Sequence, residues 1–419
     1  MTRIGILFSL GLGILTFGCG DDGSPSDVDG GTMDGSTMDA ALDAEPMDAA
    51  LDAEPMDAAA DGPSGPDGGV PGCALDSLLI VTSDFTTAEI GRLDLITDAV
   101  SVGTAPLADQ DSVADLSGCT PLLLGRGAGE VRLQSPGDPF VTERTIDIDP
   151  AGVTDFYASN PQRVITVSET QAYVLPLSRN ELVIIDPSLD GAAAITGTLD
   201  LSELLSASDA DGLLEISDAV LVETTLYVAL GRYFFDASWA IHFDAGSVLA
   251  VIDTTTDSLI DMDAAVAGVQ GIALTGNNPW RGLWHEPSTN RLFVGTTGDG
   301  FANDGGIEII DLATQTSSGY ALLESTLGAE IGGFAGLDAE TVFVLSGAEV
   351  LRWNPSTDAI DAAAVAAEVS GLLVHQGALF VWGASGLRRF DAPSGLETTP
   401  SPGPWSFGAL PIVSASAAP

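Results

Sequence analysis

A short run of apolar residues followed by a polar turn recurs along most of the chain. In its clearest copy, residues 246–259, an apolar run ends at Asp253, and Thr, Thr, Thr, Asp and Ser follow before Leu259. A short apolar run bounded by turn residues predicts a buried β-strand, a tight turn and a returning strand. The pattern therefore predicts antiparallel strand pairs and gives no information about a ligand.

Seven copies of this pattern can be aligned, and in each an apolar strand and a short connection precede a second apolar strand. Four short strands per unit, at a mean spacing near fifty residues, are typical of a β-propeller blade. The side chain that ends the second strand is expected to hydrogen-bond to the backbone of the following turn. These turn residues are Asp94, Gln134, Asp186, Asp253, Asp311, Asn354 and Asp391.

The end of the chain predicts how the ring closes. Residues 408–415 resemble the innermost strand of a blade whose other strands belong to the first copy. We expect this segment to pair with residues 78–82, because closure of the ring removes long exposed strand edges.

The repeated pattern resembles the repeat of YVTN-type (YncE-like) β-propellers, whose units run "lyV…n.v.viD..t..v", over most of residues 76–415. The third to seventh copies match well, the first fairly, and the second is degenerate. The resemblance implies an all-β fold, a seven-bladed β-propeller of four-stranded antiparallel blades, and an extracytoplasmic scaffold or binding role. It implies no shared catalytic residues.

Residues 1–19 are predicted to be an export signal. Arg3 precedes an apolar run, residues 4–17, that is too short to span a membrane comfortably. The run ends at Cys19 in a sequence similar to the lipobox of bacterial lipoproteins, in which the Cys is lipidated, although Thr16 stands where that family usually has Leu. An ordinary cleaved signal peptide is the alternative. Gly20 follows Cys19, whereas lipoproteins retained in the inner membrane usually have Asp there. We therefore expect the protein to be anchored in the outer membrane of a bacterial envelope, on its periplasmic or external side.

Residues 20–72 are predicted to be a disordered acidic tether. They contain fourteen carboxylates and no basic or aromatic residue, and the nine-residue unit 38–46 repeats at once. Such a segment has too little apolar surface to offset the entropy of ordering it. Its paired acidic residues are a candidate for Ca²⁺ binding, and a solvated linker is the simpler interpretation. Residues 73–419 then form the propeller domain.

Composition limits the partners of this domain. The chain has no Lys, and outside the tether and Arg3 it carries 46 acidic and 12 basic residues, a formal charge near −34. This charge disfavours binding to nucleic acids and to anionic lipid surfaces, which attract basic proteins. It also suits a protein that works in high salt, where screening weakens the repulsion between its charges. We expect a monomer. Cys73 and Cys119 are either a disulfide or two buried thiols.

Two copies carry additional residues between their two apolar strands. The segments 231–246 and 297–305, and the link 275–281, are predicted to emerge on the same face. Aromatic and Arg side chains are enriched in binding patches, so this rim is the candidate for contact with an envelope protein, a glycan or a small ligand. The alternative is that its aromatics simply pack the hairpin onto its blade. The candidate rim residues are Arg232, Tyr233, Trp239, His242, Trp280 and Arg281.

The sequence offers two further kinds of site. Asp299, Asn303 and Asp304, with nearby Gly, are a possible Ca²⁺ loop that matches no strict motif. An enzyme similar to propeller lactonases or quinoprotein dehydrogenases would use a metal or quinone in the central channel. The predicted inner strands offer that chemistry only Asp218, His285 and His375, and the sequence has no nucleophile elbow, phosphate loop or haem motif. A binding module is therefore the favoured interpretation.

Overall fold

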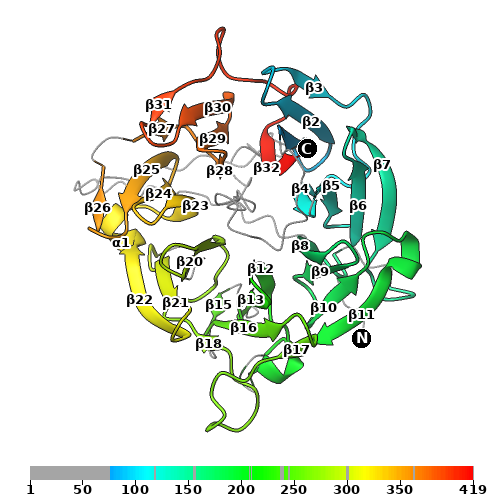
Figure 1. Ribbon diagram of the computed structural model, residues 1–419, viewed down its shortest axis with the longest axis vertical. Helices are drawn as coiled ribbons and strands as arrows, with labels where there is room; N and C mark the ends of the chain where they lie inside the picture. Colours follow the sequence, from blue (N-terminus) through cyan, green and yellow to red (C-terminus); the bar gives the residue numbers. More distant parts are fainter. Residues whose placement is uncertain are drawn as a thin grey trace, which may run out of the picture. The chain divides into compact units, whose positions relative to one another are not determined.

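The computed structural model describes residues 76–117, 119–153, 157–206, 208, 210–235, 240–243, 246–298, 302–361 and 364–418. The signal segment 1–19, the tether 20–72, and Cys73 lie outside these residues. The described residues form seven sheets of at least four antiparallel strands and one separate two-stranded hairpin. Figure 1 shows the seven sheets arranged as blades around a central axis.

Each blade runs from an innermost strand beside the axis to an outermost strand at the perimeter. Blade 1 is β32 (Ile412–Ala418), β1 (Ser77–Ser83), β2 (Ala88–Asp94) and β3 (Val100–Val102). Blade 2 is β4 (Ser112–Ser117), β5 (Thr120–Gly125), β6 (Glu130–Ser135) and β7 (Asp138–Asp147). Blade 3 is β8 (Pro161–Ser168), β9 (Gln171–Pro176), β10 (Glu181–Ile185) and β11 (Ile195–Asp200).

Blade 4 is β12 (Ile216–Val222), β13 (Thr225–Leu230), β16 (Val248–Asp253) and β17 (Ser258–Leu259), with β18 (Ile272–Ala273) also on β16. Blade 5 is β19 (Leu283–Glu286), β20 (Arg291–Thr296), β21 (Gly306–Asp311) and β22 (Thr316–Leu323). Blade 6 is β23 (Ile331–Asp338), β24 (Thr341–Ser346), β25 (Glu349–Asn354) and β26 (Ala359–Ile360), with β27 (Ala366–Ala367) on β25. Blade 7 is β28 (Gly371–His375), β29 (Ala378–Gly383), β30 (Gly386–Asp391) and β31 (Leu396–Glu397).

In the described residues, helix is confined to short connections. These are the 3₁₀ turns η1 (Gly191–Ala194) and η2 (Ser202–Leu204) and the single turn α1 (Glu324–Leu327). Within the described part of the chain, no helix is long and apolar enough to cross a membrane. The predicted all-β, seven-bladed propeller is confirmed.

The two ends of the described chain close the ring in blade 1. Strand β32 pairs with β1 in antiparallel register, from Ser77 opposite Ala418 to Thr82 opposite Ile412. The innermost strands then contact one another in cyclic order from blade 1 to blade 7 and back. The predicted closure is confirmed, but the strand begins four residues later than residues 408–415. Pro411, which has no N–H to give to a sheet, lies immediately before it.

The continuous apolar run of the repeat is explained by the position of β16. As a middle strand it faces a neighbouring blade on each side, and its side chains alternate between the two. Val248, Ala250 and Ile252 pack in the cluster shared with blade 3, whereas Leu249 and Val251 pack in the cluster shared with blade 5. Both faces are therefore apolar, and the usual alternation of polar and apolar residues disappears.

The turn residue at the end of the third strand shapes the backbone, as predicted. Asp253 accepts hydrogen bonds from the N–H of Thr255 at 2.8 Å and from its hydroxyl at 2.6 Å, and these bonds lower the pKa of Asp253. Asp94, Asp186, Asp311, Asn354 and Asp391 make equivalent bonds to their turns. Gln134 in the degenerate second copy instead pairs with Thr142 across the sheet.

Four residues after these turn residues the backbone is left-handed in five blades. The residues are Asp98, Asp257, Gln315, Asp358 and Gly395, with φ of 58°, 48°, 55°, 56° and 66°. In blade 4 this residue also connects blades, because Asp257 accepts hydrogen bonds from Gln171 and from the hydroxyl of Tyr173 in blade 3. That hydrogen bond and burial raise the pKa of Tyr173, burial having the larger effect.

Cys119, in the turn between β4 and β5, is a disulfide-bonded cysteine. The other two cysteines of the chain, Cys19 and Cys73, lie outside the described residues. The bridge from Cys73 to Cys119 therefore stays a prediction.

Candidate binding rim

Three segments of blades 4 and 5 meet on one rim of the propeller, as the sequence predicts. They are the connection from β13 to β16, the link from blade 4 to blade 5, and the connection that follows β20. The N–H of Thr297 donates to the carbonyl of Asn278 at 3.0 Å, and that of Gly298 donates to the carbonyl of Asn277 at 3.1 Å. We call this surface the blade 4–5 rim.

One buried hydroxyl joins these segments. The Ser247 Oγ donates to the carbonyl of Gly231 at 2.7 Å and accepts from the N–H of Asn278 at 2.9 Å. The carbonyl of Ser247 also accepts from the N–H of Leu274 at 3.1 Å. Ser247 is only 2% exposed, so both ends of the hairpin connection and the link are fixed by a single interior residue.

The hairpin of blade 4 presents aromatic rings that are half-buried. Its strands, β14 (Phe234–Phe235) and β15 (Ile241–His242), pair so that Phe234 lies opposite His242. Those two rings stack at 5.0 Å with planes 17° apart, and Tyr233 makes edge contacts with Phe235 at 5.7 Å and Phe243 at 6.1 Å. None of these residues belongs to a blade core cluster. These rings therefore contact one another outside the blade cores.

Three buried carboxylates hold the backbone of the rim from below. Glu215 accepts from the N–H of Tyr233 at 3.0 Å. Glu308, which is fully buried, accepts from the N–H groups of Thr275 at 3.0 Å and Gly276 at 3.1 Å. A carboxylate that accepts backbone N–H groups fixes the path of a loop, because each bond is strong and directional.

The third of these carboxylates is Glu324 at the start of α1. It accepts from the N–H of Gly305 at 2.9 Å and from that of Ile331 at 2.8 Å, and it is fully buried. Burial raises the pKa of Glu324, while the two backbone bonds and Arg281 act in the opposite direction. The sequence indicated none of these roles, although a lone Glu within the apolar strand β21 was a visible signal for Glu308.

The predicted rim residues occupy this region where they are described. Arg232 and Tyr233 open the hairpin connection, His242 lies in β15, and Trp280 is half-buried in the link. Arg281 is only 8% exposed, so its guanidinium lies mostly beneath the surface. Trp239 lies outside the described residues.

The predicted Ca²⁺ loop is only partly described. Asn303 and Asp304 lie in the connection that follows β20, and Asp299 lies outside the described residues. An Oδ1 of Asp304 lies against the backbone of Gly298, close enough to occupy the place of a side chain there. Among the residues that the structure describes, no three His, Cys, Asp or Glu side chains are grouped to hold a metal ion. Calcium binding stays a prediction.

The inner strands carry the three channel residues, but Asp218 is already engaged. Its Oδ1 accepts from Arg163 at 2.9 Å and from the N–H of Ala219 at 2.8 Å, and its Oδ2 accepts from the N–H of Leu283 at 2.8 Å. Burial raises the pKa of Asp218, and Arg163 opposes that shift. Both oxygens therefore serve to connect blades 3, 4 and 5.

The two inner-strand histidines lie in other blades. His285 in β19 contacts the Oδ1 of Asn290 at 3.4 Å, and burial lowers the pKa of its ring. His375, in β28 of blade 7, is 7% exposed. The structure thus distributes the candidate channel residues over blades 4, 5 and 7.

Comparison with known proteins finds distant structural similarity alone. No protein-family model and no curated protein matches the chain. Among solved structures, a dihydro-heme d1 dehydrogenase NirN in complex with DHE is 16% identical (TM-score 0.46, 83% of this chain and 77% of that one). Apo AztD from Citrobacter koseri is 12% identical (TM-score 0.45, 81% of this chain and 97% of that one). A puromycin hydrolase is 13% identical (TM-score 0.48, 78% of this chain and 52% of that one). Such distant similarity carries no argument about function, and membership of the YVTN-type family stays a prediction.

Proposed function

We propose that this protein is an extracytoplasmic binding module, anchored to a bacterial outer membrane by a lipid on Cys19, whose contact surface is the blade 4–5 rim. The observation that carries the proposal is the set of half-buried aromatic rings of the hairpin, at residues 233–235 and 242–243. Aromatic side chains are enriched at protein interfaces, where a few well-packed residues supply most of the binding energy.

The rigid support of this surface favours binding. A loop that is already ordered loses less conformational entropy when a partner binds. The bonds from Ser247 and Glu215 hold the backbone at the start of the ring-bearing hairpin, at Gly231 and Tyr233. Glu308 and Glu324 hold the neighbouring segments of the rim, at Thr275 and Gly305.

The position at which the chain enters the propeller also agrees with the proposal. Strands β1 and β13 are the second strands of their blades. The chain enters at the start of β1, where the carbonyl of Asp76 accepts from the N–H of Leu95 at 2.7 Å, whereas the hairpin follows the end of β13. Opposite ends of equivalent strands lie on opposite faces, so the rim opens on the face away from this entry point.

An envelope protein is the partner class that best fits half-buried aromatic rings beside an ordered polar backbone, and a glycan is the second. The acidic surface disfavours a nucleic acid. A propeller enzyme with a metal or quinone in the channel is a weaker proposal, since both carboxylate oxygens of Asp218 are bonded to neighbouring blades.

The experiment is affinity capture from envelope extracts and from a glycan panel with the intact protein. Phe234→Ala removes one ring of the stacked pair and is expected to abolish specific capture. Phe85→Ala is the matched control, because Phe85 is a 49% exposed aromatic in the equivalent connection of blade 1. Equal capture by both variants and the unaltered protein would reject the rim, and turnover of a lactone or alcohol would favour the enzyme.

A further inference from the structure

A second surface feature lies where the last blade meets the first, away from the blade 4–5 rim. It is a cavity of about 380 Å³ between the β2–β3 turn and the long connection from β31 to β32. This volume falls within the range of small-ligand pockets. Its lining residues are Asp98, Val100, Pro400, Ser401, Pro402, Gly403, Pro404, Trp405 and Ser406.

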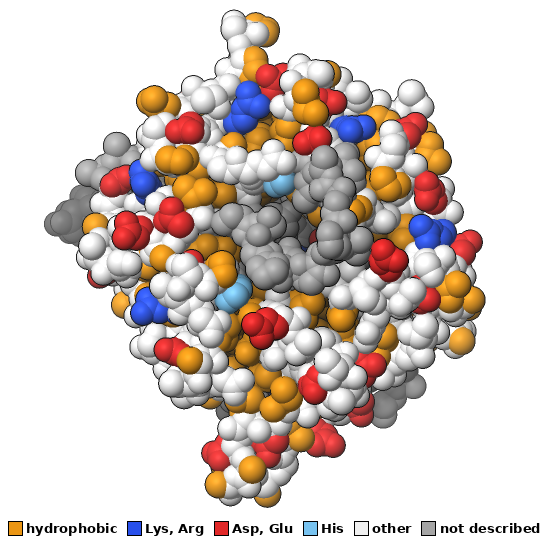
Figure 2. All heavy atoms as spheres, in the orientation of Figure 1, with side chains coloured by type: hydrophobic (Ala, Val, Ile, Leu, Met, Phe, Trp, Pro, Cys, Tyr) orange, Lys and Arg blue, Asp and Glu red, His pale blue; other side chains and the backbone are white. Residues whose placement is uncertain are grey.

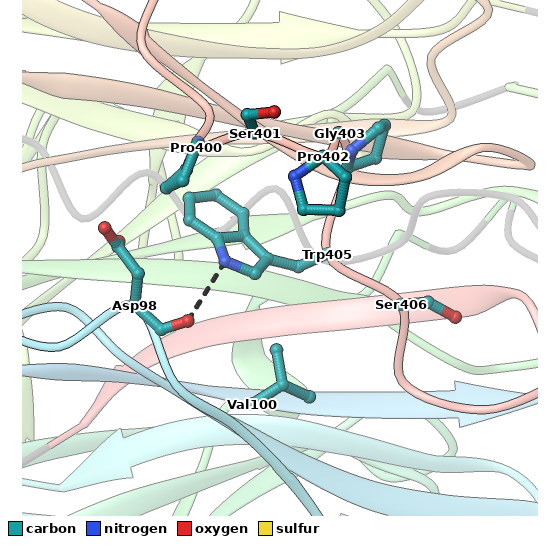
Figure 3. A pocket seen from close by; sticks show the side chains of 9 residues that line it. Asp98, Val100, Pro400, Ser401, Pro402, Gly403, Trp405 and Ser406 are labelled. Atoms are coloured by element: carbon teal, nitrogen blue, oxygen red, sulfur yellow. Dashed lines mark hydrogen bonds between the residues drawn. The ribbon is translucent and has the colours of Figure 1, made fainter.

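Trp405 and Asp98 connect the two walls of this closure pocket, and Figure 3 shows the other lining residues around them. The indole Nε1 of Trp405 donates to the carbonyl of Asp98 at 3.3 Å. The guanidinium of Arg389 donates to the Oδ1 of Asp98 at 3.0 Å and lies over the indole at 5.4 Å. The pocket wall therefore already holds one organic cation, contributed by the protein itself, against an aromatic ring and a carboxylate.

The pocket is poor in hydrogen-bond donors. Pro400, Pro402 and Pro404 have no backbone N–H. The N–H of Gly403 donates to the carbonyl of Pro400 at 3.1 Å, and that of Trp405 donates to the carbonyl of Leu387 at 3.0 Å. The indole N–H is bonded to Asp98. These donors are thus used within the protein, as is the Ser406 hydroxyl, which donates to the carbonyl of Gly408 at 3.1 Å. The Ser401 hydroxyl also lines the pocket.

Acceptors, in contrast, remain. Within the described residues, the hydrogen bond to the carboxylate of Asp98 is made at Oδ1, and its Oδ2 receives none. The carbonyl of Pro400 accepts from Gly403, whereas those of Pro402 and Pro404 are further acceptors in the lining. A lining of apolar rings with unused acceptors complements a ligand that has only donors, and an ammonium group has three donors and no acceptor.

The charge of the whole protein points in the same direction. The chain has a formal charge of −47, and acidic side chains outnumber Arg on the face seen in Figure 2. Such a surface raises the local concentration of cations. We propose that the closure pocket binds a small organic ammonium ion with an apolar body, which inserts among the proline rings and donates to the Oδ2 of Asp98.

The test uses three probes of similar shape with the intact protein at low ionic strength. These are 2-phenylethylammonium, the neutral 2-phenylethanol and the anionic 3-phenylpropanoate. The readout is the indole N–H resonance of Trp405 among the six Trp of the chain, assigned with Trp405→Phe. The ammonium probe is expected to shift this resonance saturably, the alcohol to bind at least tenfold more weakly, and the anion not to bind.

The variant Asp98→Asn keeps an acceptor for Arg389 and tolerates the left-handed backbone, but it removes the charge. This substitution should weaken the binding of 2-phenylethylammonium about tenfold. Asp358→Asn removes the same charge at the equivalent exposed turn position of blade 6 and should leave binding unchanged. A missing saturable shift, an alcohol that binds as tightly as the ammonium ion, or equal binding by Asp98→Asn would each overturn the proposal. The three probes decide it on the unaltered protein even if that variant folds poorly.

Discussion

Arg163 of blade 3 and Asp218 of blade 4 form a buried ion pair at 2.9 Å between two inner strands. The same carboxylate also accepts from the N–H of Leu283 in blade 5. Asp115 of blade 2 repeats this arrangement, since its Oδ2 accepts from the N–H of Val164 in blade 3 at 2.7 Å. Carboxylates of the inner strands therefore connect successive blades, including the one carboxylate that the sequence offered for channel chemistry.

Asp218→Ala is expected to lower the free energy of unfolding by about 3–5 kcal/mol, because it leaves Arg163 without its closest partner and the Leu283 N–H unbonded. Denaturant unfolding measures this change. Glu397→Ala, which removes an exposed carboxylate from β31, should stay within about 0.5 kcal/mol of the unaltered protein. Equal effects of the two substitutions would show that the buried carboxylate does not connect the blades.

Ser247→Ala is expected to loosen the blade 4–5 rim. The substitution removes the hydroxyl between Gly231 and Asn278, at a cost of about 1–3 kcal/mol for leaving these buried groups unsatisfied. Hydrogen exchange should accelerate at Asn278 and at Leu274, which bonds to the same residue. Ser394→Ala, in an exposed turn of blade 7, is the matched control. Unchanged exchange at Asn278 would mean that the hydroxyl does not order the link.

The raised pKa of Glu324 predicts a specific pH dependence. Between the ordinary value of 4.5 and the higher pKa in the folded protein, the folded state holds a proton that the unfolded chain has released. The contribution of this group to the free energy of unfolding therefore falls as pH rises through that interval. The pH slope of the unfolding free energy gives the difference in bound protons between the folded and unfolded states. Glu324→Gln should reduce that difference by up to one proton.

The linkage is measured from unfolding free energies at a series of pH values. Glu397→Gln, an exposed substitution in β31, corrects for the loss of one charge. If Glu324→Gln and Glu397→Gln gave the same pH slope, burial of Glu324 would not govern its protonation.

Deletion of residues 406–419 removes β32 and the buried Phe407, whose ring lies against Gly91. The innermost strand of blade 1 is then missing, and the ring cannot close. We expect a large decrease in Tm and loss of a single cooperative transition. Deletion of one tether repeat, residues 38–46, is the control and should leave Tm unchanged. An unaltered Tm after the C-terminal deletion would contradict closure through β32.

The fold was predictable because its information is periodic. Each blade repeats a pair of apolar strands and a turn residue such as Asp253. The repeat can still be recognised although its second copy is degenerate and has Gln134 at the turn position. Closure was predictable because the C-terminal segment resembles an inner strand that blade 1 lacks. The strand begins at Ile412 and not at residue 408, because Pro411 precedes the pairing segment. Period and turn chemistry depend on local sequence, so a single chain reveals them.

The construction of the rim was less predictable. The location of the aromatic hairpin followed from the extra length between two strands. The roles of Ser247, Glu308 and Glu324 did not, because each bonds to a partner at least 19 residues away in sequence. No local pattern marks a side chain that bonds to such distant N–H groups. The burial of Arg281 was hidden for the same reason.

The central claim is that the blade 4–5 rim contacts a partner, and site-specific photo-crosslinking in cells that make the protein tests it most directly. A benzophenone amino acid replaces Phe234 in one variant and Phe85, on the equivalent connection of blade 1, in the other. The account predicts a discrete adduct from position 234 and none from position 85. Adducts from position 85 alone, or none from position 234 while capture by the unaltered protein persists, would contradict it.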